Sequence, residues 1–400
     1  MGELIFNPMT PEFLQDRYAF YSRFREGDPV HRTPQGSWFV TRFDDVAFVA
    51  RDRRFGRDFG RAQTGYHGPD WAKEDSLRML SKMLLFLDPP DHSRIRSLLA
   101  QAFSAKRVDA LRGRIQAITD GLIDGVIQRG EMDIVSDFAL RVPILVICDV
   151  LGVPDEDRDR FALTFRITNG LIEAVSMTRE ELDKANAQIS FLENYFCRLF
   201  ELRRREPKED LISVLVQAEF EGSRLSNQEL VANVILLFLA GYETTSNLIA
   251  NSVLVLHQNS AQRLKLMGSP GLLPNAIDEL LRYECPVQLT ARQVLEDVTL
   301  GSKQLKAGDL VLACLGAANR DPAIYPDPDR VDIERQNIRH LSFGGGIHFC
   351  LGAQLSRIEL ECALGTLLRR LPSLKVDPHT SDWLPSFVWR GLRSLPAHWS

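Results

Sequence analysis

The chain has 400 residues, of which 44% are hydrophobic and 25% are charged, and its formal net charge at pH 7 is −5. This composition excludes a collagen-like, a disulfide-stapled or a disordered protein, and the length is sufficient for a large buried core. The small negative charge gives no bulk electrostatic reason to bind nucleic acid or an anionic membrane.

The six cysteines include no CxxC pair and no zinc-ligand spacing, which favours a reduced, cytoplasmic protein. No basic segment followed by an apolar stretch stands at the N terminus, so no secretory signal is expected. The most apolar run begins at Val231 and is interrupted by Glu243 after about a dozen residues, whereas a membrane span needs roughly 20. We therefore expect a soluble protein with no membrane and no nucleic-acid partner.

The first part of the chain is predicted to form one short strand and then mostly helices. Residues 37–41 are typical of a strand, and a short helix is expected at 44–50. Apolar residues recur at helical spacing between 93 and 129, which predicts amphipathic helices. A glycine and a proline at 151–154 end one helix, and the acidic residues at 155–157 begin the next.

A long apolar helix is predicted in the middle of the chain. It follows an amphipathic helix predicted at 179–206 and starts with Ser226 and Glu229, which have the spacing of a capping box. Because the run that begins at Val231 is almost entirely apolar, we expect this helix to lie at the centre of the core.

After Cys285 the pattern changes from helices to short strands. Residues 294–300 and 310–315 are typical of strands joined by turns, and 383–393 is predicted to form a hairpin. The sequence shows no repeat and no linker. We therefore predict a single domain over residues 1–400 that is mainly α, with a smaller β-rich region built from both ends of the chain.

The strongest motif is the ten-residue string that runs from Phe343 through Cys350 to Gly352, directly before a predicted helix. Its three consecutive glycines allow backbone conformations that a Cβ would forbid, and they bring Cys350 to the start of that helix. There the helix dipole and the backbone N–H groups favour a thiolate over a thiol. A glycine turn with a buried cysteine would explain Gly-x-Cys alone, but it leaves the rest of the string unexplained.

This string resembles the haem-ligand loop of the cytochrome P450 family, Phe-x-x-Gly-x-His/Arg-x-Cys-x-Gly. It matches at every fixed position, namely Phe343, Gly346, His348, Cys350 and Gly352. The resemblance implies the P450 fold, in which haem b lies between a long central helix and the ligand loop, and it implies that Cys350 binds the iron. A thiolate ligand donates electron density to the iron and favours O–O cleavage.

The string Ala240-Gly241-Tyr242-Glu243-Thr244 places an ionisable side chain and a weak helix former inside the apolar helix. A water-exposed helix edge is the alternative explanation. In the P450 family the matching string lies on the oxygen side of the haem. The resemblance therefore implies that Ala240 and Gly241 border the haem, that Thr244 hydrogen-bonds the dioxygen and that Glu243 relays protons. This acid and alcohol favour the use of O2 over direct use of peroxide.

Glu279 and Arg282 stand three residues apart on a predicted helix. Alone, such a pair is commonly a weak surface ion pair. It also matches the Glu-x-x-Arg motif of the P450 family, which implies a buried pair that holds the segment before the ligand loop. The third partner is expected to be an arginine, and the sequence does not decide between Arg330 and Arg335.

His92 and Arg96 are expected on one side of a helix that starts near Asp91, after two prolines. A solvated basic surface is the alternative explanation. The P450 resemblance implies that these two residues bind the haem propionates, and that Arg292 and His348 add two further contacts. Paired N–H groups of arginine suit carboxylates well.

The resemblance extends from about Pro29 to the C terminus and implies a soluble, bacterial-type haem-thiolate monooxygenase. Such an enzyme hydroxylates or epoxidises a lipophilic substrate with one atom of O2. Because no redox domain is fused to the chain, electrons from NAD(P)H are expected to arrive through a separate ferredoxin or flavodoxin with its reductase. We expect a monomer. A haem-binding sensor without catalysis is the alternative from another class, but a sensor would not need Glu243 and Thr244.

Residues 283–292 and 315–320 resemble the branch of the family that contains macrolide and polyketide hydroxylases and a fatty-acyl-cleaving relative. We therefore predict a polyketide- or macrolide-type secondary metabolite as substrate, as in antibiotic biosynthesis. A fatty acid, or an acyl chain bound to a carrier protein, is the alternative. The residues expected to line the pocket are Leu237, Gln288, Leu289, Thr290, Phe387 and Val388, together with the segments 60–87 and 165–177.

Overall fold

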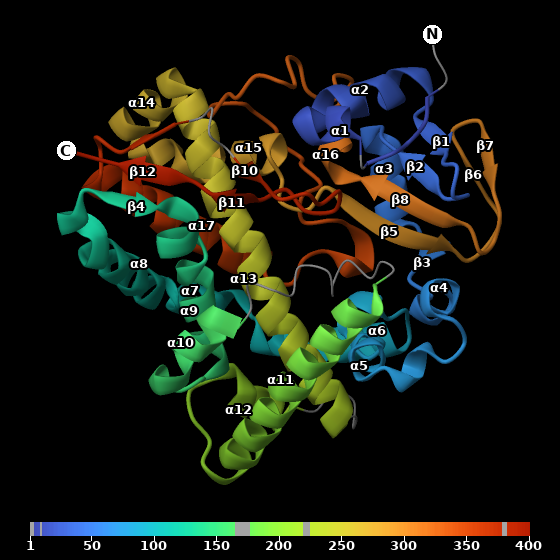
Figure 1. Cartoon of the computed structure of the whole chain (residues 1–400), viewed down its shortest axis with the longest axis horizontal. Coiled ribbons are helices and arrows are strands. Elements are labelled where there is room, and N and C mark those ends of the chain that lie inside the picture. The colour runs from blue at the N-terminus through green and yellow to red at the C-terminus, as the bar shows by residue number, and fades with distance from the viewer. Residues whose placement is uncertain (1–3, 9, 165–176, 219–224, 378–381) are drawn as a thin grey trace. The chain divides into compact units, whose positions relative to one another are not determined.

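The computed structural model describes residues 4–8, 10–164, 177–218, 225–377 and 382–400 (Figure 1). Its described helices are α1 (Pro11–Gln15), α2 (Arg17–Gly27), α3 (Phe43–Arg51), α4 (Phe59–His67), α5 (Asp75–Leu80), α6 (Asp91–Ala102), α7 (Ala105–Ala110), α8 (Arg112–Val126), α9 (Arg141–Leu151), α10 (Asp155–Thr164), α11 (Arg179–Arg205), α12 (Leu211–Leu215), α13 (Asn227–Gln258), α14 (Ser260–Gly268), α15 (Leu273–Tyr283), α16 (Leu315–Ala318) and α17 (Ala353–Arg370). Its described strands are β1 (Val30–Arg32), β2 (Trp38–Val40), β3 (Phe55–Gly56), β4 (Glu131–Asp133), β5 (Leu289–Val294), β6 (Val298–Leu300), β7 (Lys303–Leu305), β8 (Leu310–Cys314), β9 (Lys375–Val376), β10 (Asp382–Trp383), β11 (Leu392–Ser394) and β12 (Pro396–His398).

The chain folds into two compact units. The first contains Met1–Gly56, Ile115–Val142 and Thr244–Ser400, and the second contains Arg57–Arg114 and Pro143–Glu243. Every described strand belongs to the first unit, and the described part of the second unit is helical. The predicted class, mainly α with a smaller β-rich part, is confirmed.

The largest sheet joins strands from both ends of the first unit in the order β1-β2-β8-β5-β3. Strand β8 runs parallel to β2, with Val311 opposite Trp38, and antiparallel to β5, with Cys314 opposite Leu289. Figure 1 shows the N-terminal strands in blue beside the later strands β8 and β5 in orange. Pairing across this sequence distance fixes where β5, the strand that carries Arg292, lies in the first unit.

An aromatic cluster attaches the N-terminal segment to this sheet. Phe6 stacks on Phe39 with ring centroids 4.2 Å apart, and Phe13 meets Phe20 edge to face at 5.3 Å. Burial of one such side chain stabilises a fold by roughly 1.5–3 kcal/mol. The first helices are therefore held firmly against β5 and β8. The buried members of the cluster are Phe6, Phe13, Phe20, Tyr21, Phe24, Phe39, Leu289, Cys314 and Ala317.

The predicted apolar helix is α13, the longest described helix, and its capping box is present. The N–H of Ser226 donates to the Glu229 carboxylate at 2.8 Å, and the N–H of Glu229 donates to Ser226 Oγ at 3.2 Å. These two bonds satisfy N–H groups that the first helical turn leaves without partners. The helix continues without a break from the second unit into the first, between Glu243 and Thr244.

The other predicted helices also agree with the structure. The helix expected at 179–206 is α11, and a reciprocal cap between Thr178 and Glu181 fixes its start. The amphipathic stretch at 93–129 contains α6, α7 and α8, with breaks near Ser104 and Leu111. Helices α9 and α10 flank the predicted stop at 151–154.

The strand predicted at 294–300 is instead two strands, because β5 ends at Val294 and β6 covers Val298–Leu300. In the turn between them the Asp297 carboxylate accepts the backbone N–H of Ala307 at 2.9 Å. This contact joins residues that are ten positions apart, so the local apolar pattern could not reveal the break. The predicted hairpin near the C terminus is present as β10 and β11, which pair antiparallel.

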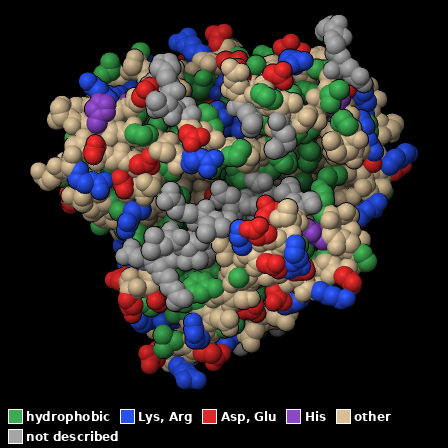
Figure 2. All heavy atoms as spheres, viewed as in Figure 1, with side chains coloured by type: hydrophobic (Ala, Val, Ile, Leu, Met, Phe, Trp, Pro, Cys, Tyr) green, Lys and Arg blue, Asp and Glu red, His purple; other side chains and the backbone are tan. Residues whose placement is uncertain are grey.

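Charges of both signs are mixed on the molecular surface. Basic and acidic side chains are interspersed over the face drawn in Figure 2, in agreement with 48 basic and 53 acidic residues in the chain. Within the described ranges, no helix has both the length and the apolar composition that crossing a bilayer requires.

Glu359 is a buried carboxyl group in the middle of α17. Its side chain is 2% exposed, and its Oε2 atom has no hydrogen-bond partner. Burial raises the pKa of Glu359 well above its ordinary value, because an ionised carboxylate is poorly solvated in the protein interior. Burial therefore favours the neutral, protonated form of this carboxyl group.

This burial predicts a pH-dependent effect of Glu359→Gln. Because the pKa of Glu359 is higher in the folded chain than in the unfolded chain, the stability it contributes is complete at low pH and is lost as pH rises above about 4.3. Glutamine keeps the shape of the neutral acid and does not titrate. We expect the Tm of the variant, relative to the wild type, to increase with pH in thermal unfolding. Glu361→Gln, two residues further along α17, is the control, and an equal Tm difference at every pH would contradict the prediction.

Candidate functional site

The loop at 343–352 closes on itself through backbone hydrogen bonds. The N–H of Cys350 donates to the carbonyl oxygen of Phe343 at 2.9 Å, which brings the two ends of the loop together. Inside the loop, the N–H of Phe349 donates to the Gly346 carbonyl at 3.1 Å. The backbone position of Cys350 is therefore set by the first residue of the motif, seven positions earlier.

Two glycines of the loop adopt backbone conformations that L side chains rarely adopt. The φ angle is +71° at Gly344 and +63° at Gly346. A Cβ atom on Gly346 would lie 2.6 Å from the carbonyl oxygen of Ala50 and 3.0 Å from the Cα of Arg51. The loop thus rests directly on the C-terminal end of α3, and a side chain at 346 would separate them.

Cys350 differs from the buried cysteines of the chain. Burial raises the pKa values of Cys148, Cys285 and Cys314 to about 12, so these three groups remain thiols. Cys350 is partly exposed and lies just before α17, for which Gly352 is the N-cap. Partial exposure beside a helix N terminus suits a thiolate that binds a metal.

One side of α13 is less buried than the rest of the helix. Between 231 and 250 the side chains are buried except at Leu237, Ala240, Gly241 and Thr244. Their spacing of three, one and three residues puts all four on one side of the helix. We call these four residues the α13 strip. It is apolar over its first part and ends in the hydroxyl group of Thr244.

Gly241 also has a packing role that the sequence did not reveal. A Cβ on Gly241 would lie 3.2 Å from two side-chain carbons of Ile147, which belongs to α9. Glycine at this position therefore lets α9 pack closely against α13. The neighbouring Glu243 is 8% exposed, so the alternative of a water-exposed helix edge is wrong for this residue.

His92 and Arg96 lie one turn apart on α6, as predicted, and His92 is 1% exposed. Arg94 lies on the opposite side of α6 and forms an ion pair with Glu229 of α13. Arg94 thus links α6 to α13 within the second unit. The side that carries His92 and Arg96 holds the basic groups suited to an anionic ligand.

The other two predicted propionate contacts, Arg292 and His348, lie in the first unit. Arg292 lies on β5 and is 3% exposed, and its Nη1 donates to Thr290 Oγ1 at 2.9 Å and to the Ala291 carbonyl at 2.8 Å. Thr290, expected to line the pocket, thus orients Arg292. His348 is partly buried in a short 3-10 turn, two residues before Cys350.

Several predicted pocket residues are engaged inside the first unit. The Gln288 side chain is fully buried, and its Nε2 donates to the Cys285 carbonyl at 2.7 Å and to Tyr18 Oη at 3.2 Å. Its backbone N–H donates to the Val388 carbonyl at 2.7 Å. Gln288 therefore holds the turn at 384–391 in place.

The aromatic cluster takes up two further predicted pocket residues. Leu289 is 4% exposed and belongs to the cluster, and Phe387 is partly buried against it. Sequence reasoning missed these contacts because the partners come from the first 40 residues of the chain. Of the expected segment 165–177, residues 165–176 lie outside the described part of the structure.

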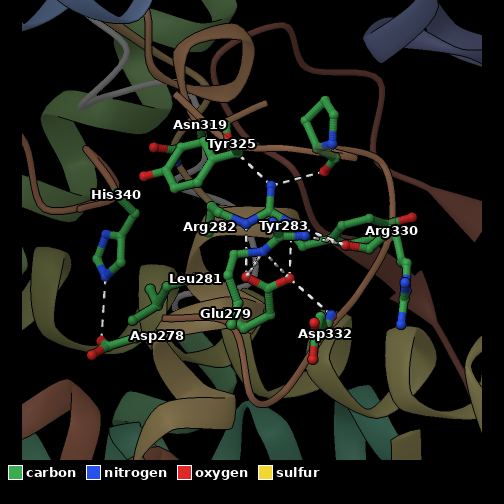
Figure 3. A network of polar contacts seen from close by, with 12 residues as sticks. Asp278, Glu279, Leu281, Arg282, Tyr283, Asn319, Tyr325, Arg330, Asp332 and His340 are labelled. Carbon is green, nitrogen blue, oxygen red and sulfur yellow. Dashed lines mark hydrogen bonds and ion pairs between the residues drawn. The ribbon is translucent and has the colours of Figure 1, made fainter. Parts of the chain in front are cut away.

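A buried charge network precedes the ligand loop (Figure 3). Glu279 and Arg282 are both 0% exposed, and the Arg282 Nε and Nη2 atoms donate to the Glu279 carboxylate at 2.7 and 2.8 Å. Arg335 is the third partner, since its Nε donates to both Glu279 oxygens at 3.1 and 3.2 Å. Arg330 contributes only its backbone carbonyl, which accepts from Arg282 and Arg335.

The residues present fit the haem that the motif resemblance implies. Cys350 offers a soft anionic donor on a loop whose glycine cradle a Cβ would fill. The α13 strip leaves an apolar surface open in an otherwise buried helix. The basic residues available for two carboxylates are His92, Arg96, Arg292 and His348.

Comparison with known proteins gives extensive matches. The family model described as Cytochrome P450 matches residues 61–267 and 255–392. Cytochrome P450 107B1 of Saccharopolyspora erythraea is 42% identical over 399 residues, covering 96% of this chain and 95% of that protein. Mycinamicin IV hydroxylase/epoxidase of Micromonospora griseorubida is 40% identical over 391 residues, covering 95% and 94%. The structure of P450BioI with an acyl carrier protein ligated to hexadec-9Z-enoic acid has a TM-score of 0.90 at 36% identity, covering 97% and 99%.

The close contact at Gly346 predicts that Gly346→Ala prevents haem binding. A non-glycine residue at this φ costs roughly 1–3 kcal/mol, and the added Cβ must also displace the backbone of α3. We expect the purified variant to carry much less haem per polypeptide, as measured by Soret absorbance against protein absorbance. Gly121→Ala is the control, because its Cβ meets nothing within 4 Å on α8. Full haem content in Gly346→Ala would show that the loop tolerates a side chain.

Proposed function

This chain belongs to the cytochrome P450 family and is a monooxygenase of that family, and from this premise we propose that it hydroxylates or epoxidises a polyketide- or macrolide-type secondary metabolite. The observation that carries the proposal is the α13 strip. Its apolar part suits a lipophilic substrate, and it leads to the hydroxyl of Thr244 next to the acid of Glu243. The mycinamicin hydroxylase/epoxidase, which shares 40% of its residues with this chain, supports the substrate class.

Cys350 is proposed to bind the iron of haem b. When bound, the haem supplies dioxygen activation, and a thiolate ligand adds electron density that favours O–O cleavage. The loop hydrogen bond from the Cys350 N–H to the Phe343 carbonyl holds the backbone of this ligand residue in place. His92, Arg96, Arg292 and His348 are proposed to bind the two propionates through charge-assisted hydrogen bonds.

Proton delivery is proposed to pass through two neighbouring residues of α13. The Thr244 hydroxyl lies on the α13 strip and would donate a hydrogen bond to the dioxygen substrate. Glu243 precedes it and supplies the proton to this hydroxyl. Leu237 and Ala240 exclude water beside the reacting carbon and bind the apolar skeleton of the substrate.

Separate redox partners are proposed to supply the electrons. We propose a ferredoxin or flavodoxin that is reduced at the expense of NAD(P)H. The protein is proposed to act as a monomer in the cytoplasm, as one functional P450 domain formed by residues 1–400.

A fatty acyl chain, free or bound to an acyl carrier protein, is the second candidate substrate. The structural likeness to P450BioI, which was solved with an acyl-loaded carrier protein, favours it. Optical titration distinguishes the candidates through the change in haem spin state. Tighter binding of a carrier-bound acyl chain than of macrolide ligands would select the second candidate.

The assignment of Cys350 predicts the spectrum of the reduced protein with carbon monoxide. We expect the strongly red-shifted Soret band of a thiolate-ligated haem in the wild type. The Cys350→Ser variant should lack this band, because a serine hydroxyl is a much weaker electron donor to iron. Absence of the band from haem-loaded, folded wild-type protein would overturn the proposed function.

The roles of Glu243 and Thr244 predict a loss of coupling between NAD(P)H oxidation and product formation. We expect Thr244→Ala to consume NAD(P)H but to release mainly peroxide, and Glu243→Gln to slow product formation on the order of 10²-fold. Product, peroxide and NAD(P)H are measured in one assay. Thr245→Ala is the control, because the Thr245 hydroxyl is buried against Ser356 Oγ at 3.2 Å. Unchanged product yield in both test variants would contradict these roles.

A further inference from the structure

The ring of Phe343, the first residue of the ligand loop, lies among charged and polar side chains. The guanidinium carbon of Arg357 is 4.6 Å from the centre of this ring, a cation–π arrangement. The His340 ring is 5.5 Å from the Phe343 ring, centroid to centroid. Arg357 comes from α17 and His340 from the segment before the loop, so two separate parts of the first unit contact this ring.

One oxygen atom of Asp278, on α15, binds both of these side chains. Arg357 Nε and Nη2 donate to Asp278 Oδ1 at 3.0 and 2.9 Å, and His340 Nε2 lies 3.3 Å from the same atom. Figure 3 shows His340 and Asp278 directed toward each other. His340 Nδ1 accepts the N–H of Ser342 at 3.3 Å, so its proton is on Nε2 and it donates to Asp278.

Asp278 and Arg357 therefore form an ion pair that is close to neutral as a whole. Partial burial opposes ionisation of Asp278, but the hydrogen bond from His340 and the charge of Arg357 hold its pKa below the ordinary value. About a third of each side chain is exposed, at 36% for Asp278 and 35% for Arg357. Such a partly exposed pair adds little stability, so its geometry around Phe343 calls for another explanation.

Phe343 is in turn hydrogen-bonded to the proposed iron ligand. The Phe343 carbonyl accepts the N–H of Cys350 at 2.9 Å, so movement of Phe343 moves the cysteine backbone. Arg357 also holds a positive charge against the Phe343 ring, and Asp278 holds a negative charge against Arg357. Both charges interact through Coulomb's law with a charge on Cys350. Both effects act on the ligand side of the haem.

We propose that the Asp278–Arg357 pair, with His340, is a positioning device that fixes Phe343 and sets the charge environment of the Cys350 thiolate, and hence the reduction potential of the bound haem. This inference rests on the proposed role of Cys350 as ligand. Arg357 and Asp278 are positioning residues, because they act on the cysteine through Phe343 and through their charges. Because the two charges balance each other, the reduction potential lies between the more positive value expected with Arg357 alone and the more negative value expected with Asp278 alone.

The test is the equilibrium reduction potential of the substrate-free holoprotein, measured by spectroelectrochemistry. Asp278→Asn leaves the Arg357 cation unbalanced, which stabilises the added electron, so the potential shifts to a more positive value. Arg357→Met leaves the Asp278 anion unbalanced, so the potential shifts to a more negative value. The double variant is neutral again and returns toward the wild type, and Arg357→Lys keeps the charge and shifts less than Arg357→Met.

Arg370→Met is the matched control on the same helix. Arg370 pairs with Asp124 at 2.6 Å, and it stands 13 residues beyond Arg357, about 20 Å along α17. Its removal changes the net charge as Arg357→Met does, at a distance where solvent and salt screen the effect. We expect its potential to match the wild type.

Shifts of the same sign in Asp278→Asn and Arg357→Met, or an equal shift in Arg370→Met, would overturn the inference. The carbon monoxide spectrum of each variant separates this failure from a failure of the proposed function. A wild type without the red-shifted band refutes Cys350 as ligand, whereas a normal band with no opposed shifts refutes only the role of the pair.

Discussion

A buried carboxylate organises the part of the chain that leads to the ligand loop. Glu279 is fully buried and is balanced by Arg282 and Arg335, and removing one partner would leave an uncompensated interior charge. The same arginines bind backbone carbonyls at Asn319, Pro328 and Arg330. The path of the chain between α16 and the loop is therefore determined by this buried charge.

Two nearby residues of that segment, Asn319 and Asp321, fix the two structures that support the loop. These are the residues directly before the loop and helix α3. The Asn319 side chain accepts the N–H of Leu341 at 2.7 Å, directly before the loop. Asp321 accepts the N–H of Phe43 at 2.9 Å and so holds the first residue of α3. Because the far end of α3 leaves no room for a Cβ at Gly346, the position of the helix decides the position of the loop. The charge network thus affects the position of Cys350 indirectly, through Leu341 and α3.

The sequence predicted those features that depend on neighbouring residues. The cap at Ser226, the start of α6 and the cysteine string are local patterns, and the structure shows the cap and the helix where they were expected. The choice between Arg330 and Arg335 depends on the path of a segment with little regular structure, and only tertiary contacts decide it. The burial of Gln288 is also non-local, because its partner Tyr18 lies 270 positions earlier in the chain.

Broken local rules were a useful but mixed signal for function. Gly241 is a poor helix former in an apolar helix, and the family resemblance implies that it borders the haem. The structure supplies a second reason, because Ile147 of α9 packs where a Cβ would lie. The residue type alone does not distinguish a packing role from a ligand-binding role, but the partial exposure of Gly241 is an additional sign of the second. The lack of a side chain at Gly241 lets α9 pack against α13. Gly241 also belongs to the partly exposed α13 strip, which can contact a ligand. Any side chain at 241 would have to satisfy both demands, which explains why a poor helix former stands in this part of α13.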